Sequence, residues 1–224
     1  MKLPAIDRLE RQLERRFVVA RTRLTLTDRV FEMVHPRSPE DLIDEADFVR
    51  DERLPYWAEL WPSGIILAEG LSGLEGEGLR LLEIGCGIGL VATSAVLAGF
   101  EVLETDYYED ALLFTRVNVA RNTGVDPPTR MLDWRSPPDD LGTFDLVVGA
   151  DVLYEQPYAG LVAALLARTI GVTGRGMIAD PGRLAAPQFR VECKRLGLTV
   201  SRLGRVPYSS GEIRQNIEVL EVRR

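Results

Sequence analysis

The chain has 224 residues, 46% of them hydrophobic and 27% charged, so it can bury one sizeable core and is expected to form a single domain with an appendage. Its net charge of −7 argues against a general nucleic-acid binder, although residues 8–23 are locally basic, and an acidic surface suits a basic substrate. With His35 as its one histidine, histidine-based triads and two-histidine metal sites are excluded as its main chemistry, and no metal site is expected.

Cysteine content and hydropathy indicate the cellular setting. Cys86 and Cys193 make no disulfide framework, which favours a reducing compartment. The sequence shows neither a charged-then-apolar leader nor an apolar run near twenty residues. We therefore expect a cytoplasmic protein without a membrane segment.

The N-terminal residues predict a helix followed by a hairpin. Residues 1–16 have the periodicity of an amphipathic helix, and residues 17–26 and 30–34 alternate as two paired strands. His35 directly follows the second strand, and we expect it at the strand end or on the surface. Three apolar residues share one face of the helix: Ile6, Leu9 and Leu13.

An aromatic segment follows a short helix predicted at residues 38–47. Trp57 and Trp61 lie four residues apart between prolines that limit any helix there to about two turns. Aromatic rings at this spacing can belong to the core or to a ligand site, and Trp61 is the better candidate for the ligand. We interpret the chain as an N-terminal extension over residues 1–53 followed by the main domain over residues 54–224.

A glycine-rich turn joins an apolar strand at residues 80–84 to a helix at residues 90–100. Gly85, Gly87 and Gly89 remove the β-carbons where the backbone turns, so a ligand can lie on exposed N–H groups at the helix start. The spacing is G-x-G-x-G, whereas a dinucleotide fingerprint needs its third glycine one residue later. The turn therefore predicts a nucleotide cradle of another kind.

The other elements are predicted from periodicity and turn residues. In chain order they are a helix at 64–74, a strand at 100–105, a helix at 107–122, a strand from the prolines at 127–128 to Asp133 and Trp134, a strand at 144–149, a helix at 161–170, a strand at 176–179, a helix at 187–196, and strands at 199–206 and 216–222 joined by a polar loop at 208–214.

Carboxylates follow two of these strands. Asp106 lies 21 residues past Gly85, where a carboxylate can accept hydrogen bonds from both ribose hydroxyls of a nucleoside. Asp151 follows the apolar strand at 144–149, and residues beyond the carboxyl ends of central strands face the ligand crevice of an open α/β sheet. We therefore expect both acids at one rim of the sheet.

The glycine turn with Glu83 before it and Asp106 after it resembles the cofactor motif of class I methyltransferases that use S-adenosylmethionine (SAM). This resemblance implies a Rossmann-like α/β fold with a seven-stranded, mostly parallel sheet, an antiparallel C-terminal hairpin and helices on both faces. It implies SAM as the cofactor and S-adenosylhomocysteine as its product. The residues that it assigns to the cofactor are Glu83, Gly85, Cys86, Gly87, Gly89, Asp106, Tyr107, Asp133, Trp134 and Ala150. It implies that Asp133 accepts the adenine amino group, and the branch described next adds Trp61 to the cofactor residues.

Two further motifs resemble the protein-methylating branch called methyltransferase family 16. One is Pro-Tyr-Trp-x-x-Leu-Trp-Pro at residues 55–62, and the other is the D-x-x-Y motif of Asp151 and Tyr154. The branch implies a protein substrate that presents a lysine. The tetrapeptide Asp-Pro-Gly-Arg at residues 180–183 resembles the motif at this position in lysine methyltransferases that modify the β-subunit of electron transfer flavoprotein. The same four residues could also form only a turn before the next helix.

The chemistry of the branch suggests roles for the two catalytic candidates. A lysine must lose its proton before it accepts a methyl group, and its usual pKa is about 10.4. Burial lowers that pKa, while a nearby carboxylate raises it. Our hypothesis is that Asp151 orients the amine and that Tyr154 packs the methylene stem and excludes water.

Other functions remain open at this stage. The motifs also allow a small-molecule N- or O-methyltransferase, an arginine or histidine methyltransferase, and a SAM-binding regulatory subunit without turnover. A nicotinamide dehydrogenase is disfavoured by the glycine spacing. The sequence does not indicate the oligomeric state.

Overall fold

The computed structural model describes residues 4–38, 42 and 55–224. The helix predicted at residues 38–47 and the boundary predicted after residue 53 lie outside or at the margin of these ranges. The division into an extension and a main domain therefore stays a prediction. Within the described ranges, no helix is long and apolar enough to cross a membrane.

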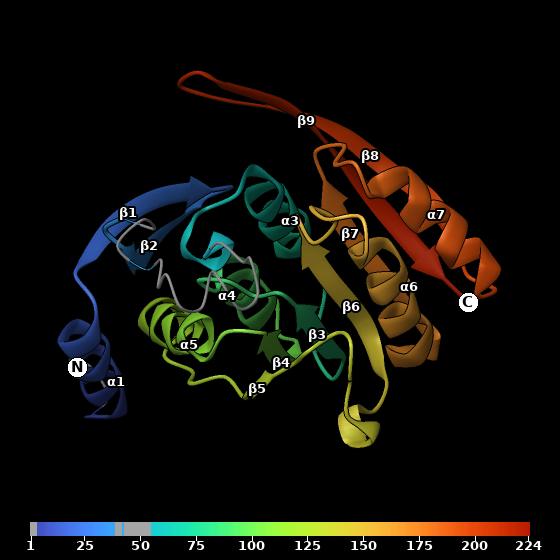
Figure 1. Ribbon diagram of the computed structural model, residues 1–224. Helices are drawn as coiled ribbons and strands as arrows, with labels where there is room; N and C mark the ends of the chain where they lie inside the picture. The colour runs from blue at the N-terminus through green and yellow to red at the C-terminus, as the bar shows by residue number, and fades with distance from the viewer. Residues whose placement is uncertain (1–3, 39–41, 43–54) are drawn as a thin grey trace.

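A seven-stranded sheet forms the centre of the molecule, with the strand order β5-β4-β3-β6-β7-β9-β8 (Figure 1). The first five strands in this order pair in parallel, and β9 is antiparallel to both β7 and β8. The predicted fold class is confirmed. The strands are β3 (Arg80–Ile84), β4 (Glu101–Asp106), β5 (Thr129–Met131), β6 (Phe144–Ala150), β7 (Ile170–Asp180), β8 (Thr199–Ser210) and β9 (Ile213–Arg223).

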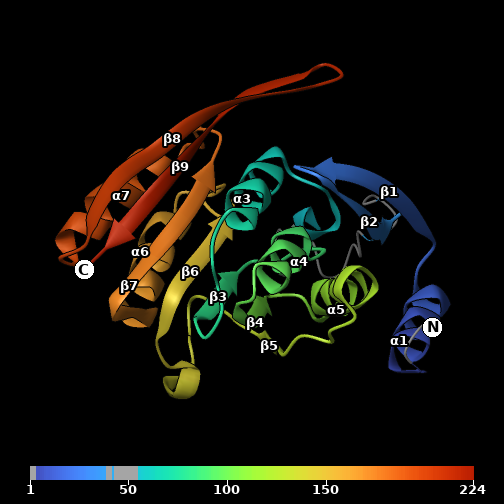
Figure 2. The same ribbon diagram turned by 180° about the vertical axis from the view of Figure 1, so that it is seen from behind.

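Helices cover both faces of the sheet (Figures 1 and 2). Alternate residues of a strand point to opposite faces. Leu81 of β3 accordingly belongs to one hydrophobic cluster with α3 (Pro62–Ser72), α4 (Leu90–Leu97) and α5 (Glu109–Thr123), while Leu82 belongs to a second cluster. The second cluster contains α6 (Tyr158–Thr169) and α7 (Ala186–Arg195).

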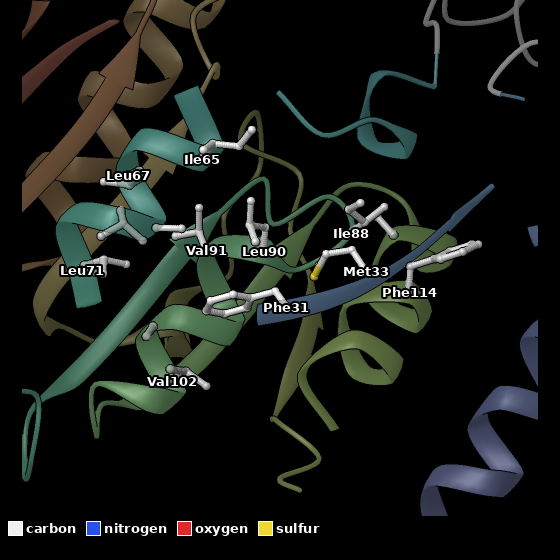
Figure 3. Packing of buried hydrophobic residues seen from close by; sticks show 14 of the residues in the cluster. Phe31, Met33, Ile65, Leu67, Leu71, Ile88, Leu90, Val91, Val102 and Phe114 are labelled. Atoms are coloured by element: carbon white, nitrogen blue, oxygen red, sulfur yellow. The ribbon is translucent and has the colours of Figure 1, made fainter. Parts of the chain in front are cut away.

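The N-terminal elements pack on the α5 side of the molecule. They are α1 (Pro4–Arg16) and a hairpin of β1 (Val19–Leu26) and β2 (Arg29–Pro36). The predicted apolar face of α1 is buried, because Ile6, Leu9 and Leu13 are each at most 7% exposed. Figure 3 shows Phe31 and Met33 of β2 in the same cluster as residues of the glycine loop and α4.

Two asparagines of α5 bind the backbone of β2. The Asn118 amide accepts the N–H of Val34 at 2.7 Å and donates to the carbonyl oxygens of Val34 at 2.8 Å and Ile88 at 2.7 Å. One turn later, the Asn122 amide accepts the N–H of Glu32 at 2.9 Å and donates to its carbonyl oxygen at 3.1 Å. These side chains therefore pair with one edge of the hairpin as a neighbouring strand would.

Several predicted boundaries shift in the structure. The residues predicted as a polar loop at 208–214 continue the pairing of β8 with β9 up to Ser210 and Ile213, with Gly211 in the turn at φ +56°. Both views show this hairpin extending beyond the rest of the sheet (Figures 1 and 2). The prediction of a loop was wrong because an exposed two-stranded ribbon needs no alternating apolar residues. β7 also begins earlier than predicted, at Ile170.

Candidate active site

The glycine loop between β3 and α4 uses backbone angles that side chains rarely adopt. Gly85, Gly87 and Gly89 have φ angles of +76°, +54° and +83°. A Cβ at Gly89 would lie 2.7 Å from the Cα of Thr115, and one at Gly87 would lie 3.1 Å from the carbonyl oxygen of Trp57. Glycine therefore lets the loop pack closely between α5 and the aromatic segment.

The N–H groups of this loop are largely used within the protein. Those of Gly85 and Cys86 donate to the carbonyl oxygen of Thr105, and that of Gly89 donates to the carbonyl oxygen of Cys86. The expectation of exposed N–H groups is wrong at these positions, because so tight a loop satisfies its own donors. The loop contributes its shape to the site instead.

Asp106 at the end of β4 is held by backbone on both sides. Its Oδ2 accepts the N–H of Gly87 and its Oδ1 accepts the N–H of Tyr108, each at 3.0 Å. The side chain is buried, which raises the pKa of Asp106, while these N–H groups lower it. Each oxygen keeps a further lone pair, so the carboxylate can also accept hydrogen bonds from a diol.

A pair of buried glutamates lies next to the loop. Glu83 of β3 and Glu104 of β4 are register partners, and each is at most 1% exposed. Burial raises the pKa of Glu83 well above its usual range, with the nearby Glu104 as a further cause. Burial also raises the pKa of Glu104 to about 7. At neutral pH at least one of these carboxyl groups is therefore protonated.

The aromatic segment forms one wall of the site. It begins with the short 3-10 helix η2 (Tyr56–Ala58). Trp57 is 8% exposed and packs against Phe114, with ring centroids 5.5 Å apart, so it belongs to the core. Trp61 is more exposed, and its indole N–H donates to the carbonyl oxygen of Tyr56 at 2.7 Å.

The residues after β5 contribute a second wall. Asp133 forms an ion pair with Arg135, whose Nη2 lies 2.7 Å from Oδ2 of Asp133, and the Arg135 guanidinium lies 5.5 Å from the ring centroid of Tyr107. Trp134 packs edge-on against Tyr158 at 5.3 Å between centroids. Asp133 was predicted as an acceptor for an adenine amino group, and the ion pair leaves fewer of its lone pairs for that role.

Asp151 stands beyond the carboxyl end of β6 in a strained backbone conformation. Its φ is +56°, which is uncommon for a residue other than glycine and typical of functional sites. Its N–H donates to the carbonyl oxygen of Ala179 at 2.9 Å. Its Oδ1 accepts the Nε–H of Arg183 at 2.8 Å, and its Oδ2 has no hydrogen-bond partner among the described residues.

Arg183 reaches Asp151 from the turn after β7. Oδ1 of Asp180 accepts the N–H groups of Gly182 at 2.7 Å and Arg183 at 2.8 Å, which confirms the turn predicted at residues 180–183. The Arg183 guanidinium carbon lies 5.3 Å from the ring centroid of Trp61. The side chain therefore bridges the rim of the sheet and the aromatic wall.

Tyr154 belongs to a row of aromatic rings. Its ring centroid lies 5.3 Å from that of Tyr56 and 4.9 Å from that of Tyr158. Burial raises the pKa of Tyr154 above its usual range, and the neighbouring Tyr158 adds to this effect. The hydroxyl therefore stays protonated at neutral pH and does not serve as a base.

One cavity of about 270 Å³ collects these groups. Every residue predicted for the site lines it except Gly89, which packs against Thr115 instead. The signal for Tyr158 was its position four residues after Tyr154, at the end of the turn that leads into α6. Lining residues without a predicted role include Tyr56, Glu59, Leu132, Arg135, Tyr158 and Leu161.

Comparison with known families places the chain. A model of the lysine methyltransferase family matches residues 44–179, which is more than half of the sequence. The chain belongs to this family.

Individual relatives agree with that assignment over part of their length. The chain is 33% identical over 125 residues to protein N-lysine methyltransferase METTL21A of Xenopus tropicalis. The alignment covers 51% of this chain and 56% of that protein. The chain is also 32% identical over 136 residues to the electron transfer flavoprotein beta subunit lysine methyltransferase of Xenopus laevis. This alignment covers 58% of the chain and 53% of that protein. The chain thus spans about half the length of the curated relatives it matches.

Solved structures share the fold at lower identity. A putative RNA methyltransferase from Pyrococcus horikoshii superimposes with a TM-score of 0.59 at 15% identity, over 75% of this chain and 88% of that one. Magnesium protoporphyrin IX methyltransferase from Synechocystis PCC 6803, solved with bound SAM, gives a TM-score of 0.55 at 17% identity, over 81% and 98% of the two chains. These similarities establish the class I methyltransferase fold.

The lining of the cavity fits SAM in its chemistry. Asp106 offers carboxylate oxygens for a ribose diol, and Trp61 and Trp134 offer aromatic faces. A Cβ at Gly85 would be in van der Waals contact with Cζ2 of Trp134 at 3.5 Å, so the glycine lies directly beside this ring. The residues present would therefore hold the nucleoside side of this cofactor.

Proposed function

We propose that the chain is a SAM-dependent methyltransferase that acts on a lysine side chain of another protein. The observation that carries this proposal is the cavity that Asp106 and the glycine loop share with Asp151 and Tyr154. Family membership supports the same reaction. Location in the cytoplasm is part of the proposal, and the two buried free cysteines are compatible with it.

The reaction needs alignment more than acid or base strength. Bound SAM supplies an activated methyl group on a positively charged sulfur. Asp151 offers its unpartnered Oδ2 to an N–H of the acceptor amine, and its backbone hydrogen bond to Ala179 fixes its position. Alignment of two reacting groups can supply roughly 7 to 11 kcal/mol of a reaction barrier.

The aromatic rings suit a lysine acceptor. Tyr56, Trp61 and Tyr154 line the cavity near Asp151 and can pack the methylene stem of a lysine while they exclude water. Burial of the amine against these rings also lowers its pKa, which favours the neutral form that accepts a methyl group.

Binding is the first test. Isothermal titration should show that SAM and S-adenosylhomocysteine bind to the purified chain and that NADH does not. Binding of NADH alone would contradict the proposal.

Methyl transfer is the second test. The chain is incubated with SAM labelled in its methyl group and with proteins extracted from the source cell, and the labelled amino acid is identified after hydrolysis. We expect methylated lysine. Only Lys2 and Lys194 of the chain itself are lysines, so the background from self-methylation is low. Label found only in small molecules would contradict a protein substrate.

Variants connect this transfer to the site. Asp151→Asn should lower the rate by at least about tenfold, because a hydrogen bond to a charged group contributes roughly 1.5 to 3 kcal/mol. Tyr154→Ala should lower it by a similar factor, because it removes the ring that packs the lysine stem and aligns the amine. Asp126→Asn changes an exposed carboxylate paired with Arg116 and is the matched control. Unchanged turnover in both site variants would refute their assignment.

The β-subunit of electron transfer flavoprotein is a specific candidate substrate. The name of the Xenopus laevis relative and the tetrapeptide at residues 180–183 support it. Other matches of similar strength are ribosomal protein L11 methyltransferases, for example that of Pseudomonas aeruginosa at 33% identity over 147 residues. Parallel assays with the purified flavoprotein subunit and with protein L11 would separate the two candidates.

A further inference from the structure

Arg183 makes an ion pair inside the cavity for which methyl transfer itself gives no reason. We propose that Arg183 is a positioning residue that holds Asp151 through one oxygen, leaves the other oxygen for the acceptor amine, and offsets the negative charge so that the amine is bound in its neutral form. The inference deepens the function proposed above and rests on it. It concerns the protonation state of the lysine at the moment of transfer.

The ion pair is fixed by backbone at both ends. On the Asp151 side, the residue has a φ of +56° and its N–H donates to the carbonyl oxygen of Ala179. On the Arg183 side, Oδ1 of Asp180 accepts the N–H groups of Gly182 and Arg183. The 2.8 Å contact between Nε of Arg183 and Oδ1 of Asp151 therefore joins two rigid turns that are far apart in sequence.

The second oxygen of Asp151 marks the place of a missing donor. The Asp151 side chain is only 6% exposed, and its Oδ2 has no hydrogen-bond partner among the described residues. A buried polar oxygen without a partner is unfavourable, so it points to a ligand group that completes it. An amine N–H is the donor that the proposed reaction brings to this cavity.

The other charges around the cavity do not replace Arg183. Asp133 and Arg135 pair with each other, and Asp106 is bound by the backbone of the glycine loop. Asp180, which packs beside the ion pair, is a further acid, and burial raises its pKa. The remaining charged lining residues are the acids Glu59, Glu83 and Glu155. Among the described residues of the cavity, Arg183 is thus the cation that contacts Asp151.

The charge of Arg183 changes which form of the amine is favoured. A lone buried carboxylate stabilises an ammonium beside it and raises the pKa of the amine by about 1 to 3. An ammonium has no lone pair and accepts no methyl group. When Arg183 neutralises the carboxylate, Oδ2 can still accept a hydrogen bond, but the site no longer favours the protonated amine.

The pH dependence of transfer tests this role. The initial rate is measured from pH 6.5 to 10 with labelled SAM and a fixed, subsaturating amount of the protein fraction that accepts methyl groups on lysine. Arg183→Gln should move the pH of half-maximal rate upward by about 1 to 3. Arg183→Lys keeps the charge and should stay near the wild-type midpoint at a lower rate. Arg116→Gln, at an exposed pair, is the control.

A binding experiment gives a readout without turnover. n-Butylamine, a lysine side-chain analogue, is titrated into the complex with S-adenosylhomocysteine, and the tryptophan indole N–H signals are followed by NMR. The wild type should bind the amine more tightly as pH rises from 7 to 10, and Arg183→Gln should lose this dependence. The double variant Asp151→Asn/Arg183→Gln removes both charges and should regain it.

The outcomes separate the two proposals. If the wild type places no methyl group on lysine, the proposed function fails, while the amine titration still reports on Arg183. If Arg183→Gln and Arg183→Lys lower the rate equally with an unchanged pH midpoint, and all forms bind n-butylamine with the same pH dependence, Arg183 has only a structural role and the inference is overturned.

Discussion

Asp106 illustrates how the glycine loop orients a carboxylate that lines the cavity. Its oxygens accept the N–H groups of Gly87 in the loop and of Tyr108 just after β4. A ligand diol would meet a carboxylate that is already oriented. The loss of conformational entropy of this side chain therefore occurs on folding and does not weaken binding.

The Asp106→Asn variant should bind SAM and S-adenosylhomocysteine at least tenfold more weakly, a loss of about 1.4 kcal/mol. An amide keeps one acceptor oxygen, but its NH2 group faces the N–H of Gly87 or Tyr108 without an acceptor. Titration calorimetry measures the dissociation constants, and Asp110→Asn on the next helix serves as the control. Equal affinities in both variants would contradict the role of Asp106.

Glu104 predicts an unusual dependence of stability on pH. Its pKa rises from 4.5 to about 7 in the folded protein, so the folded state holds a proton that the unfolded state has lost between these values. The contribution of Glu104 to the free energy of unfolding should therefore be highest below pH 4.5. This contribution should fall as pH rises through 7, by on the order of 3 kcal/mol in total.

The Glu104→Gln variant should lose this contribution and exceed the wild type in stability at pH 8. Urea unfolding at pH 5.5 and pH 8 measures the difference, with Glu101→Gln at an exposed position of β4 as the control. If Glu104→Gln is less stable than the wild type at pH 8, its carboxyl group is not the source of the effect.

At the scale of elements, α5 connects the hairpin to the glycine loop. Asn118 lies between Val34 of β2 and Ile88 of the loop and makes three hydrogen bonds to their backbones. Replacement by alanine leaves a buried N–H and two carbonyl oxygens without this partner. The Asn118→Ala variant should therefore lose roughly 2 to 4 kcal/mol in the free energy of unfolding and should bind SAM more weakly.

Asn122→Ala is a natural comparison for this variant. Asn122 makes the same kind of bonds to Glu32, but these are only partly buried, so water can replace the amide. Urea unfolding should show a smaller loss for Asn122→Ala than for Asn118→Ala. Equal losses would mean that the connection to the loop adds nothing.

The sequence predicted those parts of the fold that depend on local chemistry. The β3–loop–α4 unit was predictable because glycines and an apolar strand are adjacent in sequence, and the rim acids followed from strand ends. The Asp151–Arg183 pair was not, because it joins two turns 32 positions apart. The burial of Glu104 opposite Glu83 was also missed, because an acid in a strand is normally assigned to the exposed face.

At the scale of the whole molecule, the β8–β9 hairpin leaves an open edge. β8 ends the strand order of the sheet, and its outer edge has no partner strand among the described residues. Leu203 is 50% exposed on this strand. Such edges invite pairing with another chain, and proline or charged residues normally prevent it. Arg202, Arg205 and Pro207 stand on β8 in this protein.

The Pro207→Val variant should therefore associate with itself more readily than the wild type. Proline has no N–H and interrupts the row of donors along an open edge, whereas valine restores the donor and favours the strand. Light scattering after size exclusion over a range of concentrations measures the change. Pro138→Val, which alters a proline outside the sheet, is the control, and identical behaviour of both variants would contradict the idea.

The pairing of α5 with the hairpin also has a consequence for synthesis on the ribosome. Val34 leaves the ribosome long before its partner Asn118, which is 84 residues later in the chain. At a synthesis rate of about 5 to 20 residues per second, the edge of β2 stays uncovered for roughly 4 to 17 seconds until Asn118 is made. The hairpin is thus made before α5, and its edge is covered only after β3, α4 and β4 have followed.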